Sequence, residues 1–482
     1  MRRPARPPAL DTTCNTLFTP WVSLGLVAVA AAVLLLWPGD VPFINDEPQL
    51  VANAVAANAA GRLAPMGLQG TFGFAYGPFP TWIYQAMLAL THDLINVSVL
   101  HILLMALVTG VALRSLARSC GLWTGFIAVP LLTPYFWFYA RAIWDNTFML
   151  PLAACASAGY AAFLARQSSA GLRLAVAAML AIPLVHLMGL SLVIPLAAHL
   201  VLVHHRALLA HVKSLALIAL AAAWAAWPYA QYLLAPRPSA PSEPRVLLGW
   251  LFPLDGARLM TSMRIDYFFG AEPVSGALFS GAAIGSSLAY GFAWAGIGVG
   301  AWQVARALRA RSGWTPQLHL TVIALGTLAC QSLIHGLSAR FGHPHYQNGA
   351  WIATVWLAWA AADALRRSAK GRAIALGGAG AIVAANAAAV LALAVGLHRT
   401  HGTREVYGPT LANQQSVARD LSAYAPTSEI DNRVIMWQRF PHTLATLRAL
   451  NASKRVDLPR VQLILDYAST DPQDGSIAVA PR

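Results

Sequence analysis

Two adjacent carboxylates, Asp46 and Glu47, lie in the segment Ile44-Asn45-Asp46-Glu47-Pro48, a few residues after the first apolar stretch. Such a pair can supply a general base, because burial and mutual repulsion raise the pKa of a carboxylate. It can also hold a divalent ion. The same two residues suit the cap of a helix that starts near Pro48, since an acidic side chain there faces the positive end of the helix dipole. The spacing therefore leaves catalysis and helix capping open.

A second polar motif, Tyr139 to Asn146, follows the third apolar stretch and contains Arg141 and Asp145. Four residues separate them, so on a helical turn they would share a face and pair. An interfacial salt bridge explains this spacing. A guanidinium that holds a phosphate, with Asp145 orienting it or acting as a second acid, explains it equally well.

The third motif, Arg340 to Asn348, carries Arg340, His343, His345 and Tyr346 within nine residues. These side chains can bind a phosphate or a metal, or they can form a polar turn at a membrane surface. His343-Pro344-His345 lacks the cysteine or acidic partners of a typical zinc site. The pattern requires no cofactor, and a divalent metal remains an option. The run His204-His205-Arg206 is interpreted as a topology signal.

The composition indicates an integral membrane protein. Of 482 residues, 57% are hydrophobic and 11% are charged, with a mean hydropathy of +0.55; soluble domains have about 25% charged residues. The apolar runs are continuous and rich in Ala and Leu, as in helices, and do not alternate as barrel strands do. The net charge of +14 comes from basic residues clustered between apolar runs, which topology explains without a nucleic-acid partner.

Eleven stretches are apolar enough to serve as membrane spans, each of which needs about 20 mostly apolar residues. They lie near 20–37, 97–113, 123–139, 147–165, 174–188, 189–203, 214–234, 277–303, 319–336, 348–365 and 374–396. The boundary between the fifth and sixth falls near His186. The run Pro78–Leu90 is too short to span, and we expect it to lie along the outer surface with Trp82 and Tyr84 at headgroup level.

This count places the basic clusters in cytoplasmic segments, as the positive-inside rule requires. The N-terminus is then cytoplasmic and the C-terminus extracytoplasmic. Most of the acidic residues fall on the outer side, in long loops at 39–96 and 235–276. The fold class is therefore an all-α polytopic membrane protein of about eleven spans, residues 1–396. Residues 397–482 are predicted to form a small α/β extracytoplasmic domain, because a helix-like stretch there alternates with short strand-like runs.

The order of these features resembles the GT-C glycosyltransferase superfamily, in particular the branch with the protein O-mannosyltransferases and the lipid A aminoarabinose transferases. The resemblance covers roughly 21–361. It rests on the uncleaved first span, the acidic pair Asp46-Glu47, the surface element Gly77-Pro78-Phe79-Pro80, the pair Arg141 and Asp145, and His345-Tyr346 before a late span. The chain beyond Leu397 matches nothing in that family.

The resemblance implies an enzyme of a bacterial inner membrane that transfers a hexose or pentose, with inversion, from a polyprenyl-phosphate donor to an extracytoplasmic lipid, glycan or protein. Asp46 would be the base, Glu47 would help to place the acceptor, and Asp145 would be a further acid. The donor phosphate would contact Arg141, Arg340, His345 and Tyr346. Tyr76, Trp82 and Asp266 would line the acceptor site.

Two other classes of function compete with this interpretation. A secondary transporter buries ionisable residues at mid-membrane, whereas the predicted span centres contain almost none; His186 and His335 are the nearest exceptions. A polyprenyl-dependent polysaccharide polymerase or ligase would concentrate function in a late outer loop. Solute uptake would favour the transporter, and sugar transfer that depends on Asp46 would favour the transferase.

Overall fold

The structure is a computed structural model, and it describes residues 20–44, 46–70, 75–235, 276–311, 314–338, 344–403 and 407–416. Arg340, Asp266 and most of the predicted C-terminal domain lie outside this part of the chain. Within it, the only β pairing consists of three isolated bridges, Pro42 with Thr410, Gln69 with Ala75 and Gly402 with Pro409. The described chain is therefore helical, as the apolar runs predict.

The helices follow one another in the chain with short connections. They are α2 (Pro20–Leu34), α3 (Asp46–Ala59), α4 (Phe79–Leu90), α5 (Leu94–Ser119), η1 (Thr124–Ile127), α6 (Ala128–Leu131), α7 (Pro134–Arg141), η2 (Asn146–Phe148), α8 (Met149–Arg166), α9 (Ser169–Ala181), η3 (Ile182–Leu184), η4 (Leu187–Gly189), α10 (Leu190–Ala210), α11 (Val212–Leu234), α14 (Gly276–Ala310), α15 (Pro316–Ser338), η6 (Pro344–Gln347), α16 (Trp351–Leu365) and α17 (Ala369–Thr400).

Every predicted span falls on helical chain, and six helical segments are long and apolar enough to cross a membrane. These six are Leu94–Ser119, Asn146–Arg166, Leu187–Ala210, Val212–Leu234, Pro316–Leu337 and Ala369–Thr400. The chain is thus a multi-pass helical membrane protein. The total of eleven spans and the orientation of the termini remain predictions.

Two predicted interruptions of the helices are confirmed. The fifth and sixth spans are separated by two 3₁₀ turns, η3 and η4, with His186 in extended backbone between them. The run after Pro78 forms the twelve-residue helix α4, about 18 Å long at 1.5 Å per residue, which is too short to cross a bilayer. It packs against α3 instead.

The third predicted span is less regular than the sequence suggests. It consists of η1, α6 and α7, and α7 begins only after Thr133, whose hydroxyl accepts a hydrogen bond from Phe136 N at 3.1 Å. Proline at 130 and 134 accounts for these breaks, because proline cannot donate the backbone hydrogen bond that a helix interior needs. The helix also ends early, since Ala142 has extended backbone angles (φ −67°, ψ 125°).

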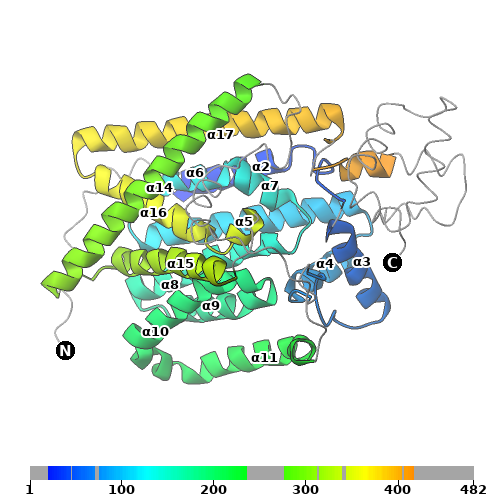
Figure 1. Ribbon diagram of the computed structural model, residues 1–482, viewed down its shortest axis with the longest axis horizontal. Coiled ribbons are helices and arrows are strands. Elements are labelled where there is room, and N and C mark those ends of the chain that lie inside the picture. Colours follow the sequence, from blue (N-terminus) through cyan, green and yellow to red (C-terminus); the bar gives the residue numbers. More distant parts are fainter. Residues whose placement is uncertain are drawn as a thin grey trace, which may run out of the picture.

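The helices α3 and α4 lie together at one end of the bundle, near the segment that follows α17 (Figure 1). That segment, residues 401–416, pairs with the loop that leads into α3: Leu411 N donates to Val41 O at 3.0 Å, and Ala412 N donates to Gly39 O at 2.9 Å. This end of the bundle carries the polar motifs identified in the sequence.

Candidate active site

The two carboxylates of the acidic pair have different environments. The Glu47 carboxylate turns back and accepts a hydrogen bond from Ile44 N at 3.2 Å, as in the reciprocal half of a capping box. Asp46 instead reaches across to another segment, where its Oδ2 accepts a hydrogen bond from Trp144 Nε1 at 2.8 Å. The capping interpretation therefore applies to Glu47, and Asp46 is the residue that faces the rest of the site.

Asp145, next to this tryptophan, is completely buried. Its Oδ1 accepts a hydrogen bond from Asn146 N at 2.7 Å, and its Oδ2 has no hydrogen-bond partner. Burial raises the pKa of Asp145 well above the ordinary aspartate value, and the nearby Asp46 and Glu47 carboxylates raise it further. Burial also raises the pKa of Asp46, against the opposing effect of the Trp144 hydrogen bond. The two aspartates are thus electrostatically coupled.

The segment η6 brings aromatic and imidazole side chains against these carboxylates. The His345 ring lies against Trp144, with centroids 4.5 Å apart, and against Tyr346 at 4.3 Å. The hydroxyl groups of Tyr76 and Tyr346 share a hydrogen bond, and the pKa of Tyr76 is raised first by burial and then by Tyr346, Asp145 and Asp46. Of the residues expected from sequence, Asp46, Asp145, Tyr76, His345 and Tyr346 therefore meet in one cluster, which we call the carboxylate cluster.

Close backbone approaches make this meeting possible. A Cβ atom on Gly77 would lie 2.1 Å from Leu184 O, so only glycine allows this approach, which places Tyr76 on His186 with ring centroids 4.3 Å apart. The start of α16 is tied down similarly, because Asn348 Nδ2 donates to Asn146 O at 3.1 Å.

Polar contacts from α7 and α15 hold η6 in the same place. The Tyr135 hydroxyl donates to Asn348 Oδ1, and Gln331 Nε2 donates to Tyr346 O at 3.0 Å. Four separate parts of the chain thus position the cluster.

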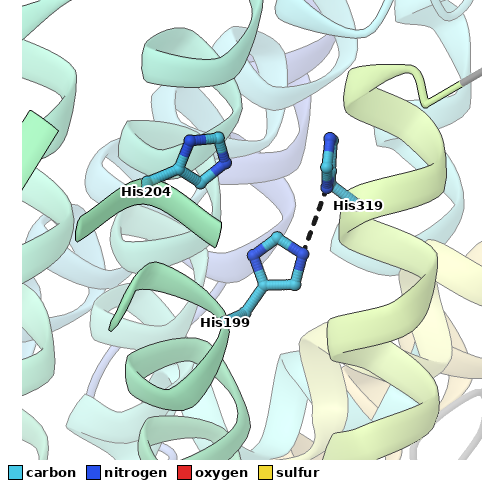
Figure 2. Close-up of side chains that lie close together, drawn as sticks. All are labelled: His199, His204 and His319. Atoms are coloured by element: carbon cyan, nitrogen blue, oxygen red, sulfur yellow. Dashed lines mark hydrogen bonds between the residues drawn. The ribbon is translucent and has the colours of Figure 1, made fainter. Parts of the chain in front are cut away.

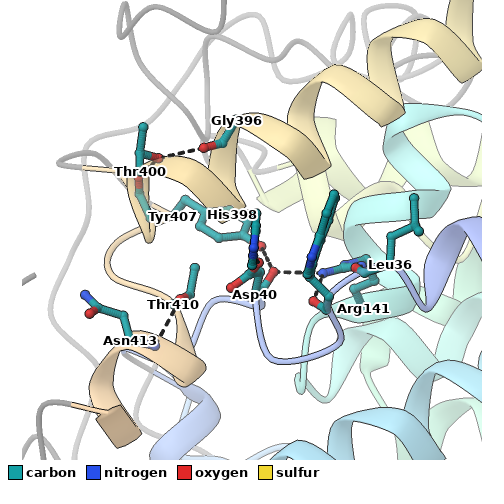
Figure 3. Close-up of polar contacts among 11 residues, drawn as sticks. Leu36, Asp40, Arg141, Gly396, His398, Thr400, Tyr407, Thr410 and Asn413 are labelled. Carbon is teal, nitrogen blue, oxygen red and sulfur yellow. Dashed lines mark hydrogen bonds and ion pairs between the residues drawn. The ribbon is translucent and has the colours of Figure 1, made fainter.

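Arg141 does not pair with Asp145. Its two Nη atoms donate to four backbone carbonyl oxygens, those of Leu34 (2.7 Å), Leu36 (2.6 Å), Trp37 (2.9 Å) and Asp40 (2.9 Å) (Figure 3). The side chain is 1% exposed, and its remaining donor, Nε, has no partner. All four Nη hydrogens are therefore engaged, and Arg141 holds the connection between α2 and α3.

The predicted Arg141–Asp145 pair is wrong because α7 ends at Arg141, so the four-residue spacing does not continue on one helical face. The predicted contact between Arg141 and a donor phosphate would require its carbonyl hydrogen bonds to break.

The remaining expected residues lie elsewhere. Trp82 Nε1 donates to Ala64 O at 2.8 Å, which places this residue at the junction of α3 and α4. Among the described residues, Asp46 and Glu47 do not belong to any group of three close metal-ligating side chains. The divalent-ion interpretation of the acidic pair therefore gains no third ligand there.

Sequence reasoning did not single out Trp144 or His186 as site residues. His186 Nδ1 accepts a hydrogen bond from Met188 N at 3.1 Å, and its Nε2 is buried without a partner. The signals were present: Trp144 is inside the quoted Tyr139–Asn146 motif, and His186 marks the predicted break between spans.

Comparison with known proteins yields a structural resemblance only. The fold and cluster define a multi-pass helical membrane protein with a buried carboxylate site. Among protein-family descriptions and curated sequences, none matches the chain. The chain resembles two crystal structures of ArnT from Cupriavidus metallidurans.

The apo ArnT structure is 18% identical, with 93% of this chain and 75% of that chain covered and a TM-score of 0.47. The structure bound to undecaprenyl phosphate is 17% identical, with 95% and 76% covered and a TM-score of 0.45. The resemblance to the GT-C superfamily noted in the sequence thus extends to structure. Similarity of this degree assigns no activity to this chain.

Proposed function

We propose that this protein is a membrane-embedded glycosyltransferase that moves a sugar from a polyprenyl-phosphate donor to an extracytoplasmic acceptor. The observation that carries the proposal is the carboxylate cluster, in which Asp46 and Asp145 meet His345, Tyr346 and Tyr76 from distant segments. Buried carboxylates with raised pKa values beside cationic or hydroxyl donors are the groups that acid–base catalysis of group transfer needs.

In the proposed reaction, Asp46 is the general base. The acceptor hydroxyl or amine attacks the anomeric carbon, its proton passes to Asp46, and the bond between the sugar and the phosphate oxygen breaks, so the configuration inverts. The leaving group is a phosphate monoester on the lipid. The indole N–H of Trp144 orients the Asp46 carboxylate through Oδ2. A pre-oriented base avoids the entropic cost of finding the reactive geometry.

Asp145 is proposed to act in its neutral form. Its raised pKa favours protonation, and a proton on the unpartnered Oδ2 would let it donate a hydrogen bond to the acceptor or share a proton with Asp46. Tyr76 is proposed to lie on the acceptor side of the cluster, and Trp82 and Asp266 are retained there as sequence predictions.

The phosphate side is proposed to consist of His345 and Tyr346, with Arg340 as the cation expected from sequence. Donors aimed at a departing phosphate stabilise the charge that develops on it. Arg141 contributes indirectly, since it fixes the connection that ends at Asp46. Glu47 also acts through position, because its hydrogen bond to Ile44 N shapes the start of α3.

The proposal places this site on the outer face of a bacterial inner membrane, with the N-terminus in the cytoplasm and the C-terminal domain outside. The clustering of Arg and Lys in the opposite loops supports this orientation. Reporter fusions after residues 94 and 118 test it, because the first must lie outside and the second inside.

The direct test is sugar transfer from a polyprenyl-phosphate sugar to membrane acceptors, wild type against Asp46→Asn. Loss of a general base lowers the rate by about 10²–10⁴-fold. The matched control is Asp93→Asn, because Asp93 caps α5 at an exposed position and asparagine caps equally well. Full activity of Asp46→Asn would overturn the assignment. Uptake of a solute by proteoliposomes, without transfer, would favour a transporter, and extension of a lipid-linked polymer would favour a polymerase or ligase.

A further inference from the structure

A second polar cluster lies at the opposite end of the bundle from the carboxylate cluster. It consists of His199 and His204 on α10 and His319 on α15, two helices that pack against each other (Figure 2). Tyr160 of α8, which contacts His199, follows Asn146 by 14 residues, so about 20 Å of helix separates the two clusters. The histidine cluster therefore belongs to a different site.

The spacing of the three imidazoles matches that of metal ligands. His199 Nε2 and His319 Nδ1 are 3.1 Å apart, and one nitrogen from each of the three residues lies within 4.8 Å of the other two. A tetrahedral zinc ion with Zn–N bonds of 2.0–2.1 Å holds its nitrogen ligands about 3.3 Å apart. Two of the ligands are thus already at the required separation, and the third needs a small side-chain movement.

Tyr160 fixes the orientation of the first ligand. Its hydroxyl lies 2.6 Å from His199 Nδ1, in hydrogen-bond contact. Metal-bound histidines engage their second ring nitrogen in this way, which fixes the tautomer and leaves the other nitrogen for the metal. In this arrangement Nε2 of His199 is the nitrogen that faces His319.

His204 supplies an independent indication of a missing ligand. Its Nε2 is buried and has no hydrogen-bond partner. The backbone at this residue leaves the helical region (φ −123°, ψ 23°) within α10, and the ring turns toward the other two histidines (Figure 2). A kinked helix that aims an unsatisfied nitrogen into a group of imidazoles is difficult to explain as packing alone.

We propose that His199, His204 and His319 bind a divalent first-row metal ion, with zinc as the best match, and that this ion joins α10 to α15 beside the α10 kink. Imidazole nitrogens suit zinc, copper and nickel, and three histidines with one water form a complete tetrahedral set. The interpretation of His204-His205-Arg206 as a topology signal is thereby narrowed, because His204 points into the bundle and His205 is exposed.

The test uses the full-length protein purified in detergent without a polyhistidine tag, stripped with a chelator and titrated with Co²⁺ and Zn²⁺. We expect one metal ion per chain, a visible spectrum of four-coordinate cobalt, and a higher melting temperature with zinc. His204→Gln and His319→Gln should weaken binding by more than about 100-fold, and Tyr160→Phe by about 10-fold. His205→Gln, the adjacent and exposed control, should bind as the wild type does.

Three results would overturn the proposal: no cobalt bands at stoichiometric metal, unchanged binding by both ligand variants, or an equal loss in His205→Gln. A variant that fails to fold is replaced by the other ligand variant, and Tyr160→Phe keeps all three imidazoles. Because the readouts are metal content, cobalt spectrum and melting temperature, the result is independent of whether the carboxylate cluster transfers sugar.

Discussion

The hydrogen bond from Trp144 Nε1 to Asp46 Oδ2, 2.8 Å long, predicts a measurable change in the pH dependence of activity. In Trp144→Phe the ring that packs on His345 is retained and only the donor is lost. This donor lowers the pKa of Asp46, so its removal must raise that pKa further. A hydrogen bond to a charged group contributes about 1.5–3 kcal/mol, and one pKa unit corresponds to about 1.4 kcal/mol. The expected rise is therefore about 1–2 pKa units.

The assay is kcat/KM for sugar transfer as a function of pH, because that profile reports the pKa of the free enzyme's essential base. A base works only when ionised, so activity falls on the acidic side of its pKa. In Trp144→Phe this acidic limb should move to higher pH by about 1–2 units. The matched control is Trp356→Phe, which loses a buried indole hydrogen bond to Thr321 Oγ1 (3.1 Å) away from the cluster.

A merely structural role for Trp144 would lower activity at all pH values and leave the acidic limb in place. An unmoved limb in Trp144→Phe, with Asp46→Asn inactive, would show that Asp46 is not titrating as the base. A limb that moves equally in Trp356→Phe would attribute the shift to general destabilisation.

Three further substitutions separate stability from activity. Asp145→Asn should abolish transfer yet raise the melting temperature at pH 7, by about 1–3 kcal/mol of stability. The pKa of Asp145 is raised in the folded state, so its favourable contribution exists at low pH and is lost as pH rises, and the difference from wild type should vanish in acid. Arg141→Lys should destabilise by about 3 kcal/mol or more in thermal unfolding, because one ammonium cannot serve four carbonyls, whereas the exposed control Arg173→Lys should not. Gly77→Ala should reduce transfer by up to about 100-fold with unchanged helical circular dichroism, since the new Cβ would displace this segment from Leu184 O.

The sequence predicted the helices well because continuous apolar runs leave few alternatives in a bilayer. It also placed Asp46 and Asp145 correctly in the connections next to helices. The break at His186 and the short helix α4 were predictable for the same reason, since each violates the length that a span requires.

The sequence could not predict which polar side chains meet. The pairing of Arg141 with Asp145 assumed that the helix continues, and two backbone angles at Ala142 overturn that assumption. The contact between Trp144 and Asp46 joins residues 98 positions apart, and that between His199 and His319 joins residues 120 positions apart. Such contacts depend on helix packing, which local spacing does not encode.

The connection before Asp46 shows how the bundle and the C-terminal segment jointly position the candidate base. On one side Arg141 donates to the Asp40 carbonyl oxygen, and on the other the Tyr407 hydroxyl donates to the same oxygen at 2.7 Å. The Asp40 carboxylate in turn pairs with His398 Nδ1 at 2.9 Å (Figure 3). Gln414 Nε2 then donates to Phe43 O at 2.8 Å, three residues before Asp46. A base held this way keeps its geometry without rearrangement during reaction, which is the property that electrostatic catalysis requires.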